Sequence, residues 1–551
     1  MMADLSNYYA LNYMITGFKN SIRFRYEQLS SCLFPLLLMV FLCYPIQGNS
    51  QVVGPVPSSF NSIQQNGVSN MAALGDTLWI GPGLNRNIGN YRTADGNALQ
   101  WYKPENADSV TDGRGRLFSI DLAPDTVIAG LGYTTEEDQV QTGLGYYLST
   151  DGGEQWNFVA LPLDAESDST IQYGGETYDK LPVVVPQQSP PFGLAFHGDV
   201  IFSANWALGV LRSTDFGNSW DRVILPPDDV QELSPERTYE WDFEENGVAM
   251  NEYNPRPFNN LKGFEVLVDR QDRVWVGTAN GINISPNALT APIDSIVWRH
   301  ISFQSPDEGL LSDWVIEMNE QPETGRIWMT NWVANPNQPE RFGLVSTRNG
   351  EQFKRYLIGE RVNAVDFDGN TIVAAGDQGL FISHDNGENW KKYTRIEGPN
   401  TFIKASARKL SVASTSERIW VGTDDGIAST ADGGDTWEIT RVDMPLDGGN
   451  QYQEDAPNVD AYAYPNPFSP TSHDLVRIKF EVQQQGNVKI ELYDYGMNLI
   501  RTIENDAFGP GTYEAVWDGN DGGGRQVANG PVFYRVKTAG GVAKGKILVL
   551  D

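Results

Sequence analysis

The chain has 551 residues, of which 71 are acidic and 40 are basic, so its formal net charge at pH 7 is −31. A chain this acidic repels phosphate-bearing polymers, so a nucleic-acid partner is not expected. Its length suits two domains with a large hydrophobic core, and an acidic surface would suit a saline habitat, Ca²⁺ binding or solubility alone.

The N-terminal segment, residues 1–50, is predicted to be a secretory signal peptide rather than part of the fold. Lys19, Arg23 and Arg25 precede the apolar run Cys32–Cys43, and the small-residue cleavage site Gly48–Ser50 follows. The run is short for a membrane span, so no transmembrane segment is expected after the signal is removed. Both cysteines lie in this segment, which leaves the mature chain without a thiol or disulfide. We expect a protein secreted from, or held on the outer surface of, a Gram-negative bacterium.

Residues 51–445 repeat a pattern of short apolar strands that end in small polar turns. Runs rich in β-branched and aromatic residues, such as Val274–Val276 and Ile419–Val421, alternate with Gly, Asn and Asp. Seven aromatic residues recur at intervals of tens of residues, a period that indicates a propeller or a solenoid. Seven four-stranded units predict an all-β fold with a seven-bladed β-propeller. The anchoring aromatic residues are Trp101, Trp156, Trp220, Trp298, Phe353, Trp390 and Trp437.

Four copies of the repeat contain the turn Ser/Thr-x-Asp-x-Gly-x-x-Trp. The Ser and Asp side chains can bond nearby backbone amides, the Gly tolerates a positive φ, and the Trp packs on a neighbouring strand. We therefore predict a structural staple between the third and fourth strands of a blade, rather than a ligand or metal site. The residues concerned are Ser149, Asp151, Gly153, Trp156, Ser213, Asp215, Gly217, Trp220, Ser383, Asp385, Gly387, Trp390, Thr430, Asp432, Gly434 and Trp437.

This turn resembles the Asp box, or BNR repeat, of sialidases, xyloglucanase-type glycosidases, sortilin-like receptors and bacterial surface propellers. The resemblance implies that the turn lies on the face opposite the ligand site. The segments Arg273–Ile282 and Arg418–Ile427 also resemble the propeller repeats of periplasmic two-component sensors, which supports the fold and not a signalling role. The sequence leaves open whether the ring closes through a strand from Ser58–Val68 or within single blades.

The long segments between the repeats are predicted to carry the binding site, because long loops on a rigid scaffold usually do. The loop Pro226–Asn260 is the most suggestive, with nine acidic and two basic residues and interleaved aromatic residues. Its rings could stack on sugars while its carboxylates accept hydrogen bonds. The alternative is a solvated acidic loop whose rings fold back on the blade. The candidate ligand-binding residues are Trp206, Tyr239, Trp241, Asp242, Trp314 and Trp332.

Beyond a polar linker at residues 446–460, residues 461–551 are predicted to form a separate β domain. Strands at Val476–Val482 and Val488–Tyr493 precede a turn at Trp517–Gly524 and two further strands. With the stretch YPNPFSP at Tyr464–Pro470, this order resembles the Ig-like domain of flagellar hook-capping proteins and the C-terminal sorting domains of the type IX secretion system. The resemblance implies export and attachment, with the secretion machinery as a partner. The alternative is a cap that only adds stability, and the sequence leaves cleavage after export open.

The sequence assigns no catalytic residue. It lacks a nucleophile elbow, a phosphate loop, a zinc signature and the arginine cluster of a sialidase. Asp366–Gly369 and Asp518–Asp521 resemble parts of Ca²⁺ loops without a full ligand set, so neither a metal nor another cofactor is expected. A glycoside hydrolase needs two carboxylates at a defined separation, and the abundance of acidic residues leaves that alternative open.

The sequence therefore predicts a secreted or cell-surface β-propeller binding protein, with an extracellular glycan or protein ligand on the connector-loop face. It is exported and anchored through its Ig-like C-terminal domain. The alternatives are an Asp-box glycoside hydrolase that acts on extracellular polysaccharide, and a structural envelope component. Two carboxylates facing each other across a central cleft would favour the enzyme, and a shallow face would favour binding.

Overall fold

The computed structural model describes residues 51–53, 58–60, 66–82, 91–93, 101–103, 116–135, 138–153, 155–441 and 459–551. These residues are almost entirely β, and their only helix is the short 3-10 helix η2 (Ile293–Ser295). Among them, no helix has the length and apolar character needed to span a membrane. The predicted signal peptide, residues 94–100 of the first repeat and residues 446–458 of the predicted linker lie outside the described residues.

Seven sheets in the described residues share one plan, in which four consecutive strands pair antiparallel in chain order. The first sheet consists of β3 (Val68–Leu74), β4 (Thr77–Pro82), β5 (Tyr91–Thr93) and β6 (Trp101–Lys103), and the second of β7 (Arg116–Ala123), β8 (Thr126–Thr134), β9 (Gln141–Ser149) and β10 (Trp156–Ala160). The third sheet consists of β13 (Gly193–His197), β14 (Val200–Asn205), β15 (Gly209–Ser213) and β16 (Asp221–Val223), and the fourth of β20 (Gly263–Val268), β21 (Val274–Thr278), β22 (Gly281–Ser285) and β23 (Trp298–Ile301). The fifth sheet consists of β24 (Trp314–Gln321), β25 (Arg326–Trp332), β26 (Gly343–Thr347) and β27 (Lys354–Tyr356), and the sixth of β28 (Val362–Asp368), β29 (Thr371–Gly376), β30 (Gly379–Ser383) and β31 (Lys391–Tyr393). The seventh sheet consists of β34 (Lys409–Ser414), β35 (Ile419–Thr423), β36 (Gly426–Thr430) and β37 (Glu438–Thr440).

Short strands add to this plan without changing it. Three of them extend outer edges: β1 (Gln51–Val53) pairs with β10, β2 (Ser58–Phe60) with β6, and β17 (Glu232–Leu233) with β23. Three hairpins stand apart: β11 (Thr170–Tyr173) with β12 (Glu176–Asp179), β18 (Asp242–Glu245) with β19 (Val248–Asn251), and β32 (Ile396–Glu397) with β33 (Phe402–Ile403).

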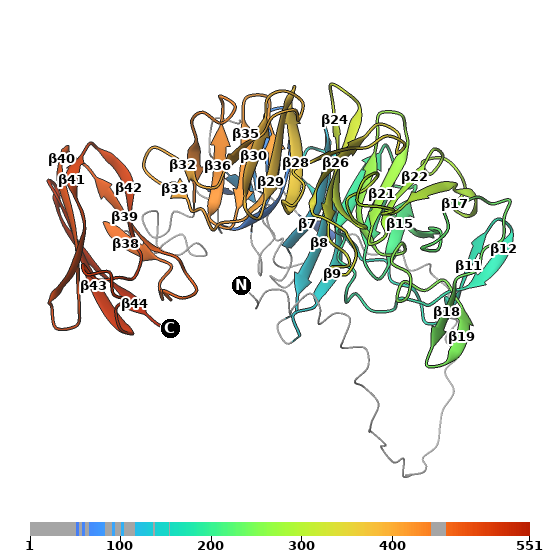
Figure 1. Cartoon of the computed structure of the whole chain (residues 1–551), viewed down its shortest axis with the longest axis horizontal. Helices are drawn as coiled ribbons and strands as arrows, with labels where there is room; N and C mark the ends of the chain where they lie inside the picture. The colour runs from blue at the N-terminus through green and yellow to red at the C-terminus, as the bar shows by residue number, and fades with distance from the viewer. Residues whose placement is uncertain are drawn as a thin grey trace, which may run out of the picture. The chain divides into compact units, whose positions relative to one another are not determined.

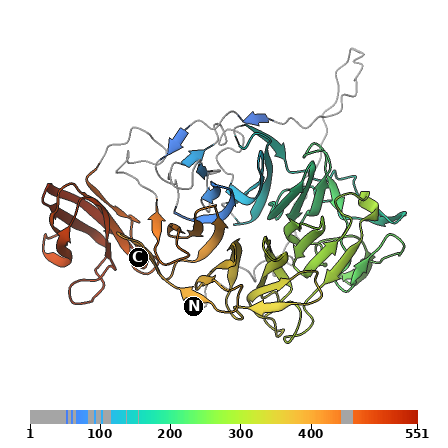
Figure 2. The ribbon, with the colours of Figure 1, turned by 90° about the horizontal axis from the view of Figure 1, so that it is seen from above.

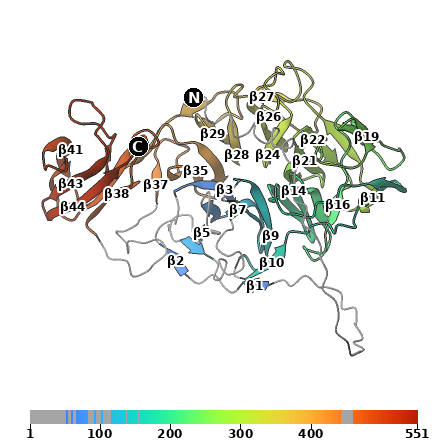
Figure 3. The ribbon, with the colours of Figure 1, turned by 90° about the horizontal axis from the view of Figure 1, so that it is seen from below.

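The first strands of the seven sheets contact one another in a closed cycle, β3–β7–β13–β20–β24–β28–β34 and back to β3. The sheets stand around a common centre, seen from above (Figure 2) and from below (Figure 3). This arrangement is a β-propeller.

The ring closes by packing rather than by strand exchange. Each four-strand sheet comes from its own stretch of chain, and β2 lies on the outer edge of the first sheet instead of completing the last one. Ser411 Oγ of β34 donates a hydrogen bond to Val68 O of β3 at 3.1 Å. Ser416 N donates to Gly75 O at 2.9 Å across the same junction. Of the two closures that the sequence left open, the structure shows closure within single sheets.

Apolar side chains fill the layers between neighbouring sheets. Because side chains alternate across a strand, each strand sends one set of residues toward the preceding sheet and the other toward the following sheet. Between the fifth and sixth sheets, for example, Trp328 and Leu344 pack with Val365 and Phe367. The core is therefore a series of inter-sheet layers that radiate from the first strands.

The C-terminal residues form two sheets around a core of their own. One sheet has the order β38–β39–β42, from Ala461–Tyr464, Val476–Val482 and Gly511–Trp517. The other has the order β41–β40–β43–β44, from Leu499–Phe508, Gly486–Tyr493, Gly530–Thr538 and Gly541–Val549 (Figure 1). Alternate residues of both sheets point inward, as the predicted strand pattern requires. The resulting core includes Val476, Ile478, Phe480, Ile490, Tyr534 and Ile547.

The YPNPFSP stretch fastens the last strand to this core. Phe468 is fully buried, with its ring centroid 5.9 Å from that of Trp517. Its backbone accepts a hydrogen bond from Leu550 N at 2.9 Å and donates one to Leu548 O at 2.8 Å. Asn466 Oδ1 accepts a further bond from Leu548 N at 2.9 Å. The motif therefore has a structural role in this domain, whatever else it does.

Two arginines and two carboxylates form a buried network between the last propeller sheet and β38–β39–β42. Arg477 on β39 donates to Asp425, in the turn after β35, through both terminal nitrogens at 2.9 and 2.7 Å. Arg441, which follows β37, donates to Glu514 on β42 at 2.8 Å. The Tyr464 hydroxyl donates to the other oxygen of Glu514. All four charged side chains are at most 8% exposed, and we call them the interdomain network.

Candidate functional site

The four repeated turns carry the same set of hydrogen bonds. In the first, Ser149 Oγ donates to Asp151 Oδ1 at 2.8 Å and accepts from Gly153 N at 2.9 Å. Asp151 Oδ1 also accepts from Gln155 N at 2.8 Å, so its carboxylate holds the turn closed. The same bonds recur around Ser213, Asp215 and Gly217, around Ser383, Asp385 and Gly387, and around Thr430, Asp432 and Gly434.

The glycine and tryptophan of each turn pack against the preceding sheet. Gly153 has a φ of 88°, and a Cβ there would lie 2.3 Å from the Trp79 ring of the first sheet. Trp220 stacks on Tyr146 of the second sheet, with ring centroids 4.6 Å apart. These contacts support the predicted structural role. Of the four indoles, Trp156 and Trp437 are buried, whereas Trp220 and Trp390 are half-buried.

Two degenerate repeats keep parts of the same turn. Asn287 Oδ1 accepts from Ser285 Oγ at 3.0 Å and from Val297 N at 2.9 Å, so an amide takes the place of the Asp across a longer loop. In the other, Gly350 N donates to Thr347 Oγ1 at 3.0 Å.

The repeated turns and three of the four predicted ligand-binding tryptophans lie on opposite faces of the ring. In an antiparallel four-strand sheet, the starts of the first and third strands share one end with the ends of the second and fourth. Trp206 lies in the turn from β14 to β15, Trp314 begins β24, and Trp332 ends β25. All three therefore lie on the connector face, whereas every repeated turn joins a third strand to a fourth at the other end.

Five aromatic rings form a continuous row across four successive sheets on the connector face. Phe118 contacts Phe192 with centroids 5.7 Å apart, and Phe192 contacts Phe264 at 6.2 Å. Phe264 contacts Trp206 at 5.3 Å and Trp314 at 5.4 Å, and the two indoles meet edge to face at 5.9 Å. Both tryptophans and Phe192 are half-buried. We call these residues the aromatic row; it brings together two of the predicted ligand-binding residues.

A β-bulge near the start of a first strand positions two rings of the row. The pairing register shifts between Leu117 and Ser119 of β7 and between Gly263 and Glu265 of β20, which leaves Phe118 and Phe264 as the extra residues. Such an insertion re-aims a side chain. Similar shifts occur at the starts of β3, β24, β28 and β34.

Cationic side chains lie over the rings of the connector face. The Lys262 ammonium is 5.3 Å from the Trp206 ring, and burial lowers the pKa of Lys262 to about 8. The Arg361 guanidinium is 3.8 Å from the Trp332 ring, and Trp332 Nε1 donates to Val362 O at 2.7 Å. Trp332 is thus half-buried on the predicted face but has its ring covered and its N–H bonded.

Two predicted binding residues of the Pro226–Asn260 loop lie in a core instead. Trp241 is fully buried and Tyr239 is 7% exposed. Trp241 packs edge to face against Tyr178 at 5.0 Å and Tyr253 at 5.5 Å, so rings of two insertions enclose it. The Tyr239 hydroxyl donates to Glu232 O at 3.1 Å. This corrects their prediction as ligand-binding residues, because no ring face is open to a ligand.

The sixth predicted residue, Asp242, is exposed on the hairpin β18–β19. This hairpin lies beside β11–β12, at the outer edge of the third and fourth sheets (Figure 1). The insertion that contains β11 and β12 is held to β16 by a buried ion network, in which Asp164 binds Lys180 at 3.1 Å and Arg222 at 2.6 Å. Asp242 therefore lies apart from the aromatic row.

Four half-buried carboxyl groups lie on the first strands, further along them than the aromatic row. Burial raises the pKa of Asp121 and Asp366 to about 6 and that of Glu265 and Glu317 well above its usual range. Repulsion by Glu317 and Asp121 adds to the shift of Glu265. We call these four residues the inner carboxyls.

The inner carboxyls bond to backbone rather than to one another. Asp121 accepts from Phe196 N of the next sheet at 3.0 Å, and Glu317 accepts from Val365 N of the next sheet at 3.0 Å. They lie on the second, fourth, fifth and sixth sheets, and Asp121 and Glu317 tie neighbouring sheets together. All four have a raised pKa. Glycoside hydrolysis needs one protonated and one ionised carboxyl. Within the described residues, no group of three or more His, Cys, Asp or Glu side chains is arranged to hold a metal ion.

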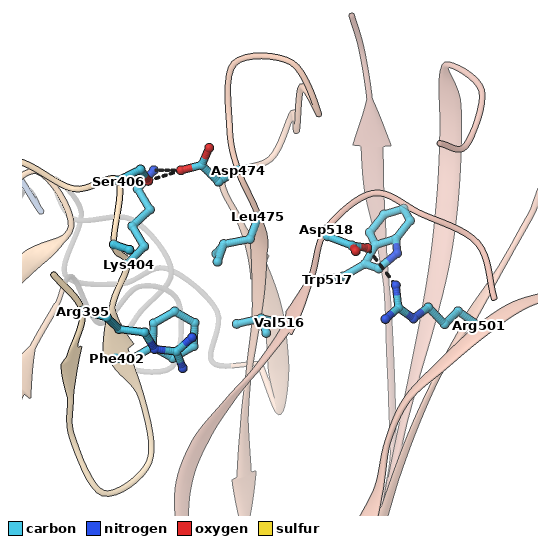
Figure 4. Close-up of a pocket in the computed structure, with 11 residues that line it drawn as sticks. Arg395, Phe402, Lys404, Ser406, Asp474, Leu475, Arg501, Val516, Trp517 and Asp518 are labelled. Carbon is cyan, nitrogen blue, oxygen red and sulfur yellow. Dashed lines mark hydrogen bonds and ion pairs between the residues drawn. The ribbon is translucent and has the colours of Figure 1, made fainter. Parts of the chain in front are cut away.

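A pocket of about 460 Å³ lies away from the aromatic row, between the β32–β33 region and the C-terminal sheets. Figure 4 shows Lys404 reaching Asp474, at 3.4 Å, and Arg501 reaching Asp518, at 2.8 Å. Phe402, Leu475 and Val516 supply the apolar part of the lining. Because these lining charges are already paired, the pocket is a junction between parts of the fold rather than a site prepared for a charged ligand.

Sequence reasoning missed the three phenylalanines of the aromatic row. Phe118, Phe192 and Phe264 look like ordinary apolar residues at strand starts. The available signal is weak: Phe118 and Phe264 lie within the first three residues of a first strand, and Phe192 immediately precedes one. The interdomain network had no sequence signal, since its members are more than thirty residues apart in most pairs.

No protein-family model and no curated protein matches this chain. Solved structures similar to it include PorZ, a surface component of the type-IX secretion system of Porphyromonas gingivalis, with 13% identity over 88% of this chain and 75% of that chain and a TM-score of 0.32. Another is the GH74 enzyme of Niastella koreensis, with 13% identity over 90% of this chain and 74% of that chain and a TM-score of 0.43. YCF48 from Cyanidioschyzon merolae has 16% identity over 60% of this chain and 85% of that chain, with a TM-score of 0.34.

Proposed function

We propose that this chain is a secreted or cell-surface β-propeller protein that binds an extracellular glycan or protein on its connector face. The observation that carries the proposal is the aromatic row, in which Trp206 and Trp314 are half-buried beside the buried ring of Phe264. Contiguous apolar rings with a cation at hand, here Lys262, are typical of binding surfaces for sugars and for proteins.

The finer architecture belongs to the same proposal. The seven sheets are seven blades, and the repeated turns are Asp boxes that staple each blade to the one before it. The two C-terminal sheets are an Ig-like sandwich that serves as a type IX sorting domain, exports the chain and anchors it to the outer surface of a Gram-negative cell. The closed cycle of first strands supports the blade count, and the YPNPFSP stretch supports the sorting role.

Binding is tested with residues 51–551 and a panel of soluble polysaccharides set into native gels. We expect at least one polysaccharide to retard the protein, and W206A/W314A to weaken that retardation at least about tenfold, because truncating a central ring costs about 2 kcal/mol or more. Tyr495→Ala is the matched control, since Tyr495 is 81% exposed in the C-terminal domain. Equal retardation of both variants would place the ligand elsewhere. A chain that no polysaccharide retards would leave a protein ligand or a structural envelope role.

A glycoside hydrolase is the second candidate, and the raised pKa values of the inner carboxyls favour it. A carboxyl whose pKa is raised to about 6, such as Asp121 or Asp366, is partly protonated near pH 6 and is suited to act as a general acid. The same panel, scored for new reducing ends over a day, tests it. We expect none, because Asp121 and Glu317 are bonded to backbone N–H groups of the next sheet rather than to each other. Hydrolysis would instead be established if the wild type released reducing ends, heat-treated wild type released none, and Glu317→Gln lost the release.

A further inference from the structure

The C-terminal domain has one open sheet face, and that face is basic. Because Val488, Ile490, Val532, Val536 and Ile547 point into the core, their neighbours on β40, β43 and β44 point outward. The outward set contains five basic residues and one acidic residue, Glu491. The basic residues, which we call the basic face, are Lys489, Arg535, Lys537, Lys544 and Lys546.

The single carboxylate on this face is already neutralised. Glu491 is 6% exposed and pairs with Lys489 at 2.7 Å and with Arg535. These two hydrogen bonds hold its pKa at about 2. Lys537, Lys544 and Lys546 form none of the ion pairs among the described residues, so the face keeps an excess of positive charge.

The basic face also offers apolar surface. Val542 is 51% exposed and Leu548 is 37% exposed. Val542 pairs with Lys537 across β43 and β44, and Lys544 pairs with Arg535. Along a strand, side chains on one face are about 7 Å apart, and neighbouring strands are about 5 Å apart. The result is a flat array of separated cations with apolar side chains between them. The other sheet offers no such surface, because its Arg477 and Glu514 are buried in the interdomain network.

The charge of this face contrasts with the rest of the chain. Residues 461–551 contain ten acidic and nine basic residues, so nearly all of the net charge of −31 belongs to the preceding residues. A protein with an acidic body and a basic end has complementary surfaces on each copy.

The hairpin β18–β19 has the matching chemistry. Asp242, Glu244 and Glu245 are exposed on β18 and form none of the ion pairs among the described residues. Val248 is 56% exposed and Met250 is 37% exposed on β19. We call this element the acidic hairpin. Glu245 shares one face of the hairpin with Val248 and Met250, and Asp242 and Glu244 lie on the other face, so the hairpin presents carboxylates on both sides and apolar side chains on one.

We propose that the acidic hairpin of one molecule docks on the basic face of a second copy of this chain. The contact joins two different surfaces, so it is heterologous and propagates into chains unless the rotation closes a ring. The contact is small, so we expect it to be weak and transient. Repulsion between the two acidic bodies is screened beyond about 8 Å at physiological salt, which leaves the short-range contact. The inference rests on the proposed surface location, where a high local concentration would make such a contact effective.

Sedimentation velocity of residues 51–551 at increasing concentration tests the proposal. We expect the weight-average mass to rise at 0.1 M NaCl and to return to that of the monomer at 0.5 M NaCl. K544E/K546E and E244K/E245K should each abolish the rise. The matched control is K354E/K391E, which changes the charge equally on exposed lysines of two propeller edge strands.

Two further samples, a combined variant and a mixture of variants, make the test specific. The combination of K544E/K546E with E244K/E245K in one chain should associate again, because both charges are reversed. A mixture of the two separate variants should also associate, because the unchanged hairpin of one variant fits the unchanged face of the other and the reversed hairpin fits the reversed face. A monomeric wild type, or equal loss in the control, would overturn the proposal. W206A/W314A should associate like wild type, which separates this result from failure of ligand binding.

Discussion

Replacing Arg477 by Met will uncouple the unfolding of the C-terminal domain from that of the propeller. Arg477 is 4% exposed and donates to both oxygens of Asp425 from another part of the fold. Removing one partner of a buried ion pair leaves the other charge without compensation, at a cost of about 3–5 kcal/mol. Arg441 still lies 3.3 Å from Asp425 in the variant, so we expect the lower end of that range.

The measurement is differential scanning calorimetry of residues 51–551. The wild type should unfold with the C-terminal domain coupled to the propeller, and Arg477→Met should show a separate transition at lower temperature. Arg477→Lys should unfold its C-terminal domain at a temperature between those of the wild type and Arg477→Met, because Lys keeps the charge but cannot form the bidentate hydrogen bond to Asp425.

Arg525→Met is the control for this experiment. Arg525 is 85% exposed and pairs with Asp521 at 3.0 Å within the C-terminal domain. An exposed pair contributes about 0–1 kcal/mol, so this variant should unfold almost like wild type. Identical traces for Arg477→Met and Arg525→Met would show that the interdomain network does not hold the domain in place.

Local chemistry explains what the sequence predicts well. The repeated turn is specified within eight residues, and its bonds from Ser149 and Asp151 reach only two to four residues along the chain. Strand alternation similarly predicts the inward residues of the C-terminal sheets, such as Ile478 and Phe480. Such features depend little on the rest of the molecule.

Long-range packing explains what the sequence does not predict. Tyr239 and Trp241 had two interpretations, and the buried one holds because Tyr178 and Tyr253 complete a cluster from two insertions. Strand alternation places Arg477 on an outer face, where exposure is expected, and only contact with the last propeller sheet buries it. The aromatic row likewise assembles from four sheets.

Two adjacent glycines in the first repeated turn should respond very differently to the same substitution. Gly152 and Gly153 both have positive φ values, 69° and 88°. A Cβ at Gly152 meets nothing within 4 Å, whereas a Cβ at Gly153 would lie 2.3 Å from Trp79. Trp79 is 3% exposed and packs edge to face on Trp156, so it has no free space to enter.

Gly152→Ala should therefore lower the free energy of unfolding by only the backbone cost of a left-handed residue, about 1–2 kcal/mol. Gly153→Ala should add an overpacking cost of about 1–3 kcal/mol, because the ring or the turn must shift. Urea unfolding of the propeller, followed by tryptophan fluorescence, measures both. Equal losses would mean that the turn does not press on the preceding sheet, and would remove the physical basis for treating the repeat as a staple between neighbouring blades. A larger loss at Gly153 would instead show that the repeat stabilises the ring through contacts between sheets, which leaves the opposite face free to vary for binding.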